Sequence, residues 1–203
     1  MCIRDSLLIG KANPSGKLPI TFPRAVGQIP MYHAHKNTGR PANASNWVSM
    51  DKIPVEAWQT SLGNTSHYLD EGFTPLFPFG FGLSYAQFDY QNLRIDKQKM
   101  TKSATILAEV EVKNTGKYAG KEVAQLYIQD LFGSVTRPVK ELKGFQKMDL
   151  KAGETKTIRF EISAKDLNFF NADMDFTTEA GNFKLWIGAN AACQNFVEFE
   201  VIN

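Results

Sequence analysis

From residue 88 to the C-terminus, apolar side chains recur at every second position in short runs that turn residues separate. The run 106–113 (ILAEVEVK) alternates aliphatic side chains with mostly charged ones, and the run 197–201 (VEFEV) alternates apolar side chains with glutamates. A period of two is that of a strand with one buried face, whereas a helix repeats every 3.6 residues. The pattern therefore predicts an all-β fold for this part of the chain.

About seven such runs follow one another, and this number of short strands is typical of an immunoglobulin-like β-sandwich. Turns are expected at Asn114–Gly116 and Lys151–Glu154, and Gly144 is expected at a β-bulge within a strand. A short helical turn is predicted over Ala164–Phe170. The expected strands cover Phe88–Ile95, 106–113, Glu122–Asp130, Glu141–Leu150, Thr155–Ile162, 183–187 and 197–201.

The first 84 residues have a different character, because eight of the nine prolines lie there. Proline fixes φ and removes a backbone donor, which argues against long helices and central strands. Two elements are predicted: the end of a helix at Leu7–Ile9, stopped by Gly10, and a strand over Lys17–Phe22. These elements have no core of their own, so residues 7–30 are expected to be the tail of an upstream α/β domain.

The chain is expected to divide within its proline-rich part. Residues 31–85 are predicted to be a loop-rich linker that packs on the upstream domains, and residues 86–203 form the sandwich. Residues 1–6 (MCIRDS) lack the charged and apolar regions of a signal peptide. They resemble a translated sequencing adapter, and we expect them to be a non-native scar.

The charge distribution excludes two classes of partner. The sequence has 23 basic and 21 acidic side chains, spread along its whole length, and a net charge of +2. This balance provides no basic surface for nucleic acid and no basic amphipathic segment for a membrane surface. No run approaches the roughly 20 apolar residues that cross a bilayer. We therefore expect neither a nucleic acid nor a membrane as partner.

Three blocks of sequence carry a family resemblance. They lie at 13–41 (NPSGKLP, FPR, GQIP and NTGRP), at 75–85 (PLFPFGFGLSY) and at 112–145 (VKNTG, GKEVAQLY and RPVKELKGF). In this order they resemble the close of the second catalytic domain, the junction that follows it, and the fibronectin type III-like domain of family 3 glycoside hydrolases. The resemblance extends from about Leu7 to the C-terminus and is greatest to the bacterial periplasmic β-glucosidases of that family.

The resemblance implies an activity, and it also implies that the catalytic groups lie elsewhere. The family hydrolyses terminal β-D-glucosyl residues by the retaining route, which requires two carboxyl groups. The nucleophile and the acid/base both belong to motifs upstream of Leu7, so no catalytic residue is assigned in this sequence. The chain is therefore expected to be the C-terminal scaffold of a β-glucosidase and to be inactive alone.

Partners and location follow from the same resemblance. The expected partners are the upstream catalytic domains of the same polypeptide, a β-glucoside or oligosaccharide substrate in the intact enzyme, and a second copy in a homodimer. The expected location is the periplasm or the exterior of the cell. No cofactor is expected. No metal is expected either, because His33 and His35 share one face of an extended chain but lack a third ligand.

Four residues of the proline-rich part are candidates for the rim of the intact active site. Tyr68 and Asp70 are expected to contact sugar hydroxyls, and Trp47 to stack on a sugar face. His67 stands where related enzymes commonly carry an arginine, and His33 stands where they often carry a second tyrosine. The alternative for Asp70 is a solvated loop carboxylate, and the alternative for Trp47 is a loop anchor.

Two functions of another class stay open from the residues alone. A free-standing carbohydrate-binding module would present exposed, coplanar aromatic rings, whereas most aromatic residues here alternate into the predicted core. A dimerisation module would act through contacts between two copies. A sandwich fold hosts all of these functions, so the fold does not decide between them.

Overall fold

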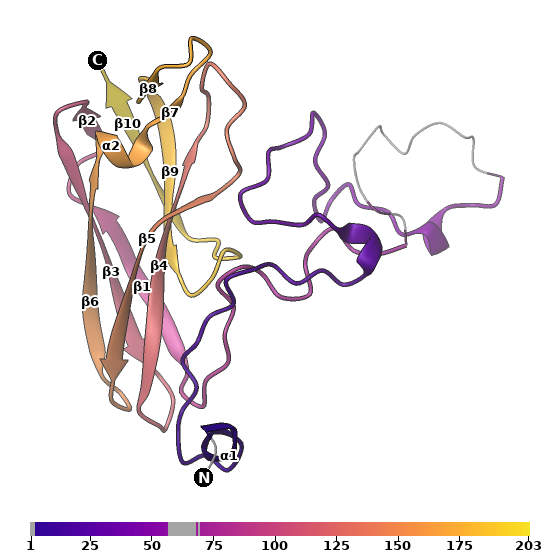
Figure 1. The fold of residues 1–203 in the computed structure, drawn as a ribbon, viewed down its shortest axis with the longest axis vertical. Coiled ribbons are helices and arrows are strands. Elements are labelled where there is room, and N and C mark those ends of the chain that lie inside the picture. The colour runs from indigo at the N-terminus through magenta and orange to yellow at the C-terminus, as the bar shows by residue number, and fades with distance from the viewer. Residues whose placement is uncertain (1–2, 57–67, 69) are drawn as a thin grey trace.

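A computed structural model describes residues 3–56, 68 and 70–203 of the chain. Figure 1 shows an upright β-sandwich with the first part of the chain extended along and away from one side of it. We call the described residues up to 85 the arm. The arm contains the helix α1 (Ile3–Leu8) and two single-turn 3-10 helices, η1 (Val26–Gln28) and η2 (Met50–Lys52). No helix in the described part of the chain is long and apolar enough to span a membrane.

The sandwich consists of two sheets with a small two-stranded sheet at one end. The strand orders are β1-β3-β6 and β2-β10-β9-β4-β5, and neighbours are antiparallel except for β10 and β2. The strands are β1 (Phe88–Ile95), β2 (Lys99–Thr101), β3 (Thr105–Asn114), β4 (Gly120–Asp130), β5 (Glu141–Leu150), β6 (Thr155–Ser163), β7 (Phe169–Phe170), β8 (Phe176–Thr177), β9 (Gly181–Gly188) and β10 (Phe196–Ile202).

The core lies between the two large sheets and is formed by the apolar positions of the alternating runs. Phe183 of β9 stacks on Phe199 of β10, with 5.2 Å between the ring centroids. Burying side chains of this size stabilises the fold by about 1.5–3 kcal/mol each. The largest of its fully buried side chains are Met100, Ile106, Val110, Val112, Ile128, Leu150, Ile162, Phe183, Leu185 and Val201.

All seven predicted strands are present, and the predicted fold class is confirmed. The structure adds three strands, β2, β7 and β8, which have two or three residues each and are too short to show an alternating pattern. The predicted bulge is also present, because Leu126 pairs with Gly144 while Tyr127 pairs with Leu142. Lys143 is therefore the extra residue on β5.

The helical turn after β6 is shorter than predicted. Helix α2 covers only Ala164–Leu167, and Ser163 and Asp166 form a capping box at its start. Asn168 is extended, and the two phenylalanines that follow it pair with β8 instead of continuing the helix. Tertiary pairing has here overridden a local helical preference.

The arm contains one confirmed and one wrong prediction. Helix α1 ends at Leu8, close to Gly10, which has a φ of +74°. The strand predicted over Lys17–Phe22 does not form. An isolated bridge joins Phe22 to Phe77, and Leu18 exchanges backbone hydrogen bonds with Gly80 and Phe81. Pro19 and Pro23 lack the N–H groups that a regular ladder requires, which explains why the pairing stays local.

Strand β4 differs from the half-buried strand that its alternation predicts. Gln125 and Tyr127 lie on the face that points away from the core, yet they are only 3% and 0% exposed. The arm covers this face of β4, as does the loop between β9 and β10. Both faces of the central strand are therefore buried, and the contact between arm and sandwich is part of the folded structure.

Candidate functional site

The junction between the arm and the sandwich is built around a buried amide. The side chain of Gln125 donates to the carbonyl oxygens of Gly80 (3.0 Å) and Ala189 (2.7 Å). Its oxygen accepts a hydrogen bond of 2.6 Å from the hydroxyl of Tyr127. Buried polar groups that are fully hydrogen-bonded fix one arrangement of their neighbours. This amide thereby ties the arm to β4 and to the loop after β9.

A buried ion pair joins the arm to the sandwich at a second point. The ammonium group of Lys17 lies 2.9 Å and 3.1 Å from the two carboxylate oxygens of Glu122 on β4. The hydroxyl of Tyr90 on β1 donates to the same carboxylate at 2.9 Å. Burial, and then the charge of Glu122, raise the pKa of Tyr90 far above its usual value. The three groups form one network that spans the arm and both sheets.

His33 packs the arm against the outer face of β4. Its ring stacks on Phe79 at a centroid distance of 4.0 Å and meets Tyr127 edge-on at 6.2 Å. Burial lowers the pKa of His33 below its ordinary value of 6.5, while the nearby Glu141 opposes this shift. The imidazole is therefore neutral at pH 7 and acts as a packing group in the junction.

This shift predicts a pH dependence of stability. A depressed folded-state pKa means that the unfolded chain binds a proton at His33 before the folded chain does. The contribution of the neutral His33 to the stability of the fold is therefore fully present above pH 6.5, the ordinary pKa of histidine. This contribution is lost as the pH falls through the lower pKa that His33 has in the folded chain. The variant His33→Phe, which can keep the stacking, should lose less unfolding free energy than wild type between about pH 7 and pH 5. Urea titrations at both pH values measure this, and equal losses in the two proteins would contradict it.

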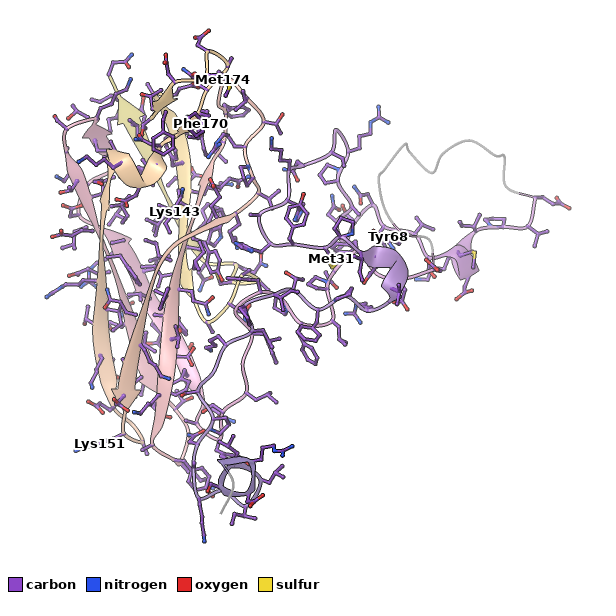
Figure 2. All side chains as sticks on the ribbon, viewed as in Figure 1. Met31, Tyr68, Lys143, Lys151, Phe170 and Met174 are labelled. Carbon is purple, nitrogen blue, oxygen red and sulfur yellow. The ribbon has the colours of Figure 1, made fainter. Side chains whose placement is uncertain are left out.

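A cavity of about 310 Å³ lies within the arm, on the side of the candidate rim residues. Tyr68 and Met31 both line it and lie close together in Figure 2. We call it the rim cavity. Beneath it, the buried side chain of Gln28 donates to the carbonyl oxygen of Gly72 at 2.8 Å and accepts from the backbone N–H of Arg24 at 2.6 Å. The cavity is lined by Gln28, Pro30, Met31, Tyr32, His35, Lys36, Asn37, Thr38, Pro41, Ala42, Tyr68 and Phe73.

The structure brings two of the four candidate rim residues together. The indole N–H of Trp47 donates to the backbone carbonyl of Tyr68 at 3.1 Å, and the Trp47 ring also packs against Phe73. Asp70 is exposed and does not line the rim cavity. His67 lies outside the described residues. Trp47 therefore holds the backbone of Tyr68, which lines the cavity.

Sequence reasoning did not identify several walls of this cavity. Tyr32 lay within the resembling segment, but no pattern separated it from its neighbours. No pattern separated Gln28 or Phe73 from their neighbours either, because their contacts join separate segments of the arm: Gln28 bonds to Gly72, 44 residues away, and Phe73 packs against Trp47. A hydrogen bond of 2.9 Å from the N–H of Val139 to the carbonyl oxygen of His35 joins this part of the arm to the sandwich. It too connects segments that are far apart in the sequence.

The rim cavity lacks the carboxyl groups that glycoside hydrolysis requires. Retaining hydrolysis uses two of them about 5–5.5 Å apart. Among the described residues no aspartate or glutamate lines the cavity, and Asp51, Glu56 and Asp70 are exposed while Glu71 is half-buried. In the described part of the chain no group of three or more His, Cys, Asp or Glu side chains is placed to hold a metal ion. The part of the cavity that the structure describes therefore contains no catalytic pair.

Two family profiles match the sequence. The glycosyl hydrolase family 3 C-terminal domain matches residues 5–85, and a fibronectin type III-like domain matches residues 122–191. The first profile therefore covers the arm, and the second covers the middle of the sandwich. Together they span the junction described above.

Curated relatives and solved structures give the same result. The periplasmic beta-glucosidase of Salmonella typhimurium is 44% identical over 97% of this chain and 24% of its own length. The thermostable beta-glucosidase B of Acetivibrio thermocellus is 39% identical over 91% of this chain and 23% of its own length. The crystal structure of beta-glucosidase from Listeria innocua in complex with glucose superposes with a TM-score of 0.85 at 38% identity, over 98% of this chain and 26% of that one.

The chain thus spans about a quarter of the length of the relatives that it matches. The match extends through both the arm and the sandwich. The chain belongs to family 3 of the glycoside hydrolases and carries the C-terminal domain and the fibronectin type III-like domain of that family.

Proposed function

We propose that this chain serves as the scaffold of a β-glucosidase that hydrolyses terminal β-D-glucosyl residues with retention. The junction carries this proposal, because buried side chains bind the family 3 C-terminal segment to the sandwich through Gln125 and through the pair of Lys17 and Glu122. A segment fixed in this way presents a stable surface to the catalytic domains. The names of the relatives, several of them beta-glucosidases, support the substrate class.

The arm also has the surface expected of a part that packs on other domains. Ile20, Val26, Ile29 and Leu83 are 59%, 83%, 61% and 73% exposed. Apolar groups exposed in this number on one segment are typical of an interaction surface. Their partner in our proposal is the catalytic portion of the same polypeptide.

The domain boundaries and location are part of the same proposal. Residues 7–30 complete an upstream α/β domain, residues 31–85 run along it, and residues 86–203 form the fibronectin type III-like domain. Residues 1–6 are the non-native scar. A periplasmic location is supported by the name of the Salmonella relative. A homodimer of the intact enzyme remains a prediction that size-exclusion chromatography with light scattering tests.

In the intact enzyme, Tyr68, Trp47, Asp70 and His67 contribute to the rim of the active site in our proposal. The support is the rim cavity, in which Tyr68 is held through its backbone by Trp47. The free-standing carbohydrate-binding module has less support. An exposed aromatic pair of the sandwich, Phe170 and Phe176, is tilted by 45° and offers no flat platform for a sugar ring.

A chimera tests the proposed function. The matching region of the Salmonella enzyme is replaced by residues 7–203 of this chain, and hydrolysis of 4-nitrophenyl β-D-glucoside is measured. The chimera should fold and hydrolyse this substrate. Trp47→Ala in the chimera should raise KM about 3- to 10-fold, the loss expected for one aromatic contact. Tyr118→Phe, on the exposed surface of the sandwich, is the control and should leave KM unchanged. A folded but inactive chimera would contradict the proposal.

A further inference from the structure

The loop that joins β4 to β5, residues 131–140, lies on the side of the sandwich that faces the arm (Figure 1). It contains the run RPVK at 137–140, which belongs to the third block of the family resemblance. Surface loops are mobile unless their own side chains hold them. We call this loop the clasp loop, because its contacts hold it to the sandwich on one side and to the arm on the other.

The clasp loop is bonded to the wall of the rim cavity. The N–H of Val139 donates to the carbonyl oxygen of His35 at 2.9 Å. Beside it, Pro138 and Lys36 form an isolated antiparallel bridge. His35 and Lys36 line the rim cavity, and Nδ1–H of His35 donates to the carbonyl oxygen of Tyr32, another wall residue, at 2.9 Å. A shift of the clasp loop therefore moves one wall of the rim cavity.

Arg137 fixes the clasp loop at its base. Its guanidinium pairs with Asp130, the last residue of β4, at 3.6 Å and with Glu141, the first residue of β5, at 2.9 Å. The ring of Phe169 on β7 packs against the guanidinium, whose carbon lies 4.0 Å from the ring centre. The planar fork of arginine can bind two carboxylates at once, whereas the ammonium of lysine is a single point charge.

The contact between Arg137 and Asp130 is buried, so its loss has a large local effect. The two side chains are only 11% and 5% exposed. Their facing atoms, Arg137 Nε and Asp130 Oδ2, form no hydrogen bond with the described residues, and each is compensated by the charge of the other. Without Arg137 a buried carboxylate at the end of β4 loses its counter-charge. The clasp loop then has to rearrange to admit water.

Lys140 holds the other end of the run RPVK. Its ammonium group donates to the carbonyl oxygens of Ala191 (3.0 Å) and Cys193 (2.9 Å), in the loop between β9 and β10. With both ends of the run held, the position of Val139 between them is fixed. The hydrogen bond from Val139 to His35 is fixed with it.

We propose that Arg137 is a positioning residue for substrate binding, because through the clasp loop it sets the His35 wall of the rim cavity. This inference rests on the proposed function, in which the rim cavity contacts the substrate. Arg137 does not line that cavity, so it acts through Val139 and His35 and not on the bond that is cleaved. Its loss should therefore weaken the binding of the substrate and leave the chemical step unchanged.

Hydrogen exchange of the 203-residue chain tests the positioning by itself. In Arg137→Met, exchange of the Val139 amide should accelerate at least about tenfold more than exchange of the β3 amides in the other sheet. Arg94→Met is the matched control, because Arg94 also pairs with a glutamate, Glu109 at 2.6 Å, but is largely exposed and distant in sequence from the clasp loop. It should leave the Val139 amide as in wild type. Equal acceleration of the Val139 and β3 amides in Arg137→Met would show only a general loss of stability and would overturn the proposal.

The chimera with the Salmonella enzyme tests the effect on the substrate. Arg137→Met should raise KM for 4-nitrophenyl β-D-glucoside about 3- to 10-fold, with kcat within about twofold of the parent chimera. Arg137→Lys keeps the charge but not the fork, and its KM should lie between the two. Arg94→Met should have the KM of the parent chimera.

The outcomes separate this inference from the proposed function. An active parent chimera whose KM is unchanged by Arg137→Met would overturn the role of Arg137 and leave the scaffold proposal intact. A folded but inactive parent chimera would contradict the scaffold proposal, and this inference with it. If Arg137→Met does not fold, Arg137→Lys decides, and an unchanged KM together with an unchanged Val139 exchange rate would refute the positioning role.

Discussion

Replacing Gly80 with alanine is expected to lower the free energy of unfolding by about 2–4 kcal/mol. Gly80 has a φ of +77°, a conformation that costs other residues about 1–2 kcal/mol. In addition, a β-carbon at this position would overlap the side-chain amide of Gln125, with the amide carbon only 2.7 Å away. That amide is held by its bonds to Gly80, Ala189 and Tyr127 and cannot move aside without breaking them.

Gly153 offers a matched control for this variant. It has the same φ of +77°, but nothing lies within 4 Å of an added β-carbon. Gly153→Ala should therefore cost only the conformational penalty of about 1–2 kcal/mol. Urea unfolding of the two variants, followed by circular dichroism, isolates the contact with Gln125. Equal losses in the two variants would show that the arm does not pack on β4 as described.

Replacing Glu122 with leucine is the second large effect, with an expected loss of about 3–5 kcal/mol. The side chains of Lys17 and Glu122 are only 15% and 4% exposed, so the variant leaves a largely buried ammonium without its counter-ion. The hydroxyl of Tyr90 also loses its acceptor. The first consequence acts on the contact between the arm and the sandwich, and the second acts on the contact between the two sheets.

A double variant separates the lost charge from the lost packing. Lys17→Met combined with Glu122→Leu removes both charges, and it should recover most of the stability because paired apolar replacements are often close to neutral. The exposed pair of Lys99 and Glu200, 2.8 Å apart with side chains 66% and 40% exposed, gives the comparison. Glu200→Leu should change the stability by less than about 1 kcal/mol. Chemical denaturation of all four proteins measures these values, and a double variant no more stable than Glu122→Leu would contradict the account.

The alternating runs predicted the sandwich because the physical cause of each strand lies within the run itself. Side chains at every second position of β3 and β10 share a face, so burial of that face selects the strand and its register. The turn at Lys151–Glu154 and the bulge beside Gly144 were equally local features. Strands β7 and β8 were not predicted, since two-residue pairings have no period to detect.

The arm was harder to predict because distant segments decide its structure. The run Lys17–Phe22 alternates like a strand, but its prolines limit it to local contacts with residues 77–81. The burial of Gln125 and Tyr127 depends on the arm, which lies more than 40 residues earlier in the chain. Trp47 and Tyr68, two of the four residues suggested for the rim, contact each other, but no sequence pattern identified the cavity that Tyr68 lines.

The central claim is that the chain is a scaffold whose catalytic carboxyl groups lie outside it. The direct measurement is hydrolysis of 4-nitrophenyl β-D-glucoside by the purified 203-residue chain at pH 7, with the Salmonella enzyme as the positive control. The account predicts no release of 4-nitrophenol above the buffer rate, because no carboxylate of the described residues lines the rim cavity. A saturable rate that rises with the concentration of the chain and falls in the variant Asp70→Asn would contradict it.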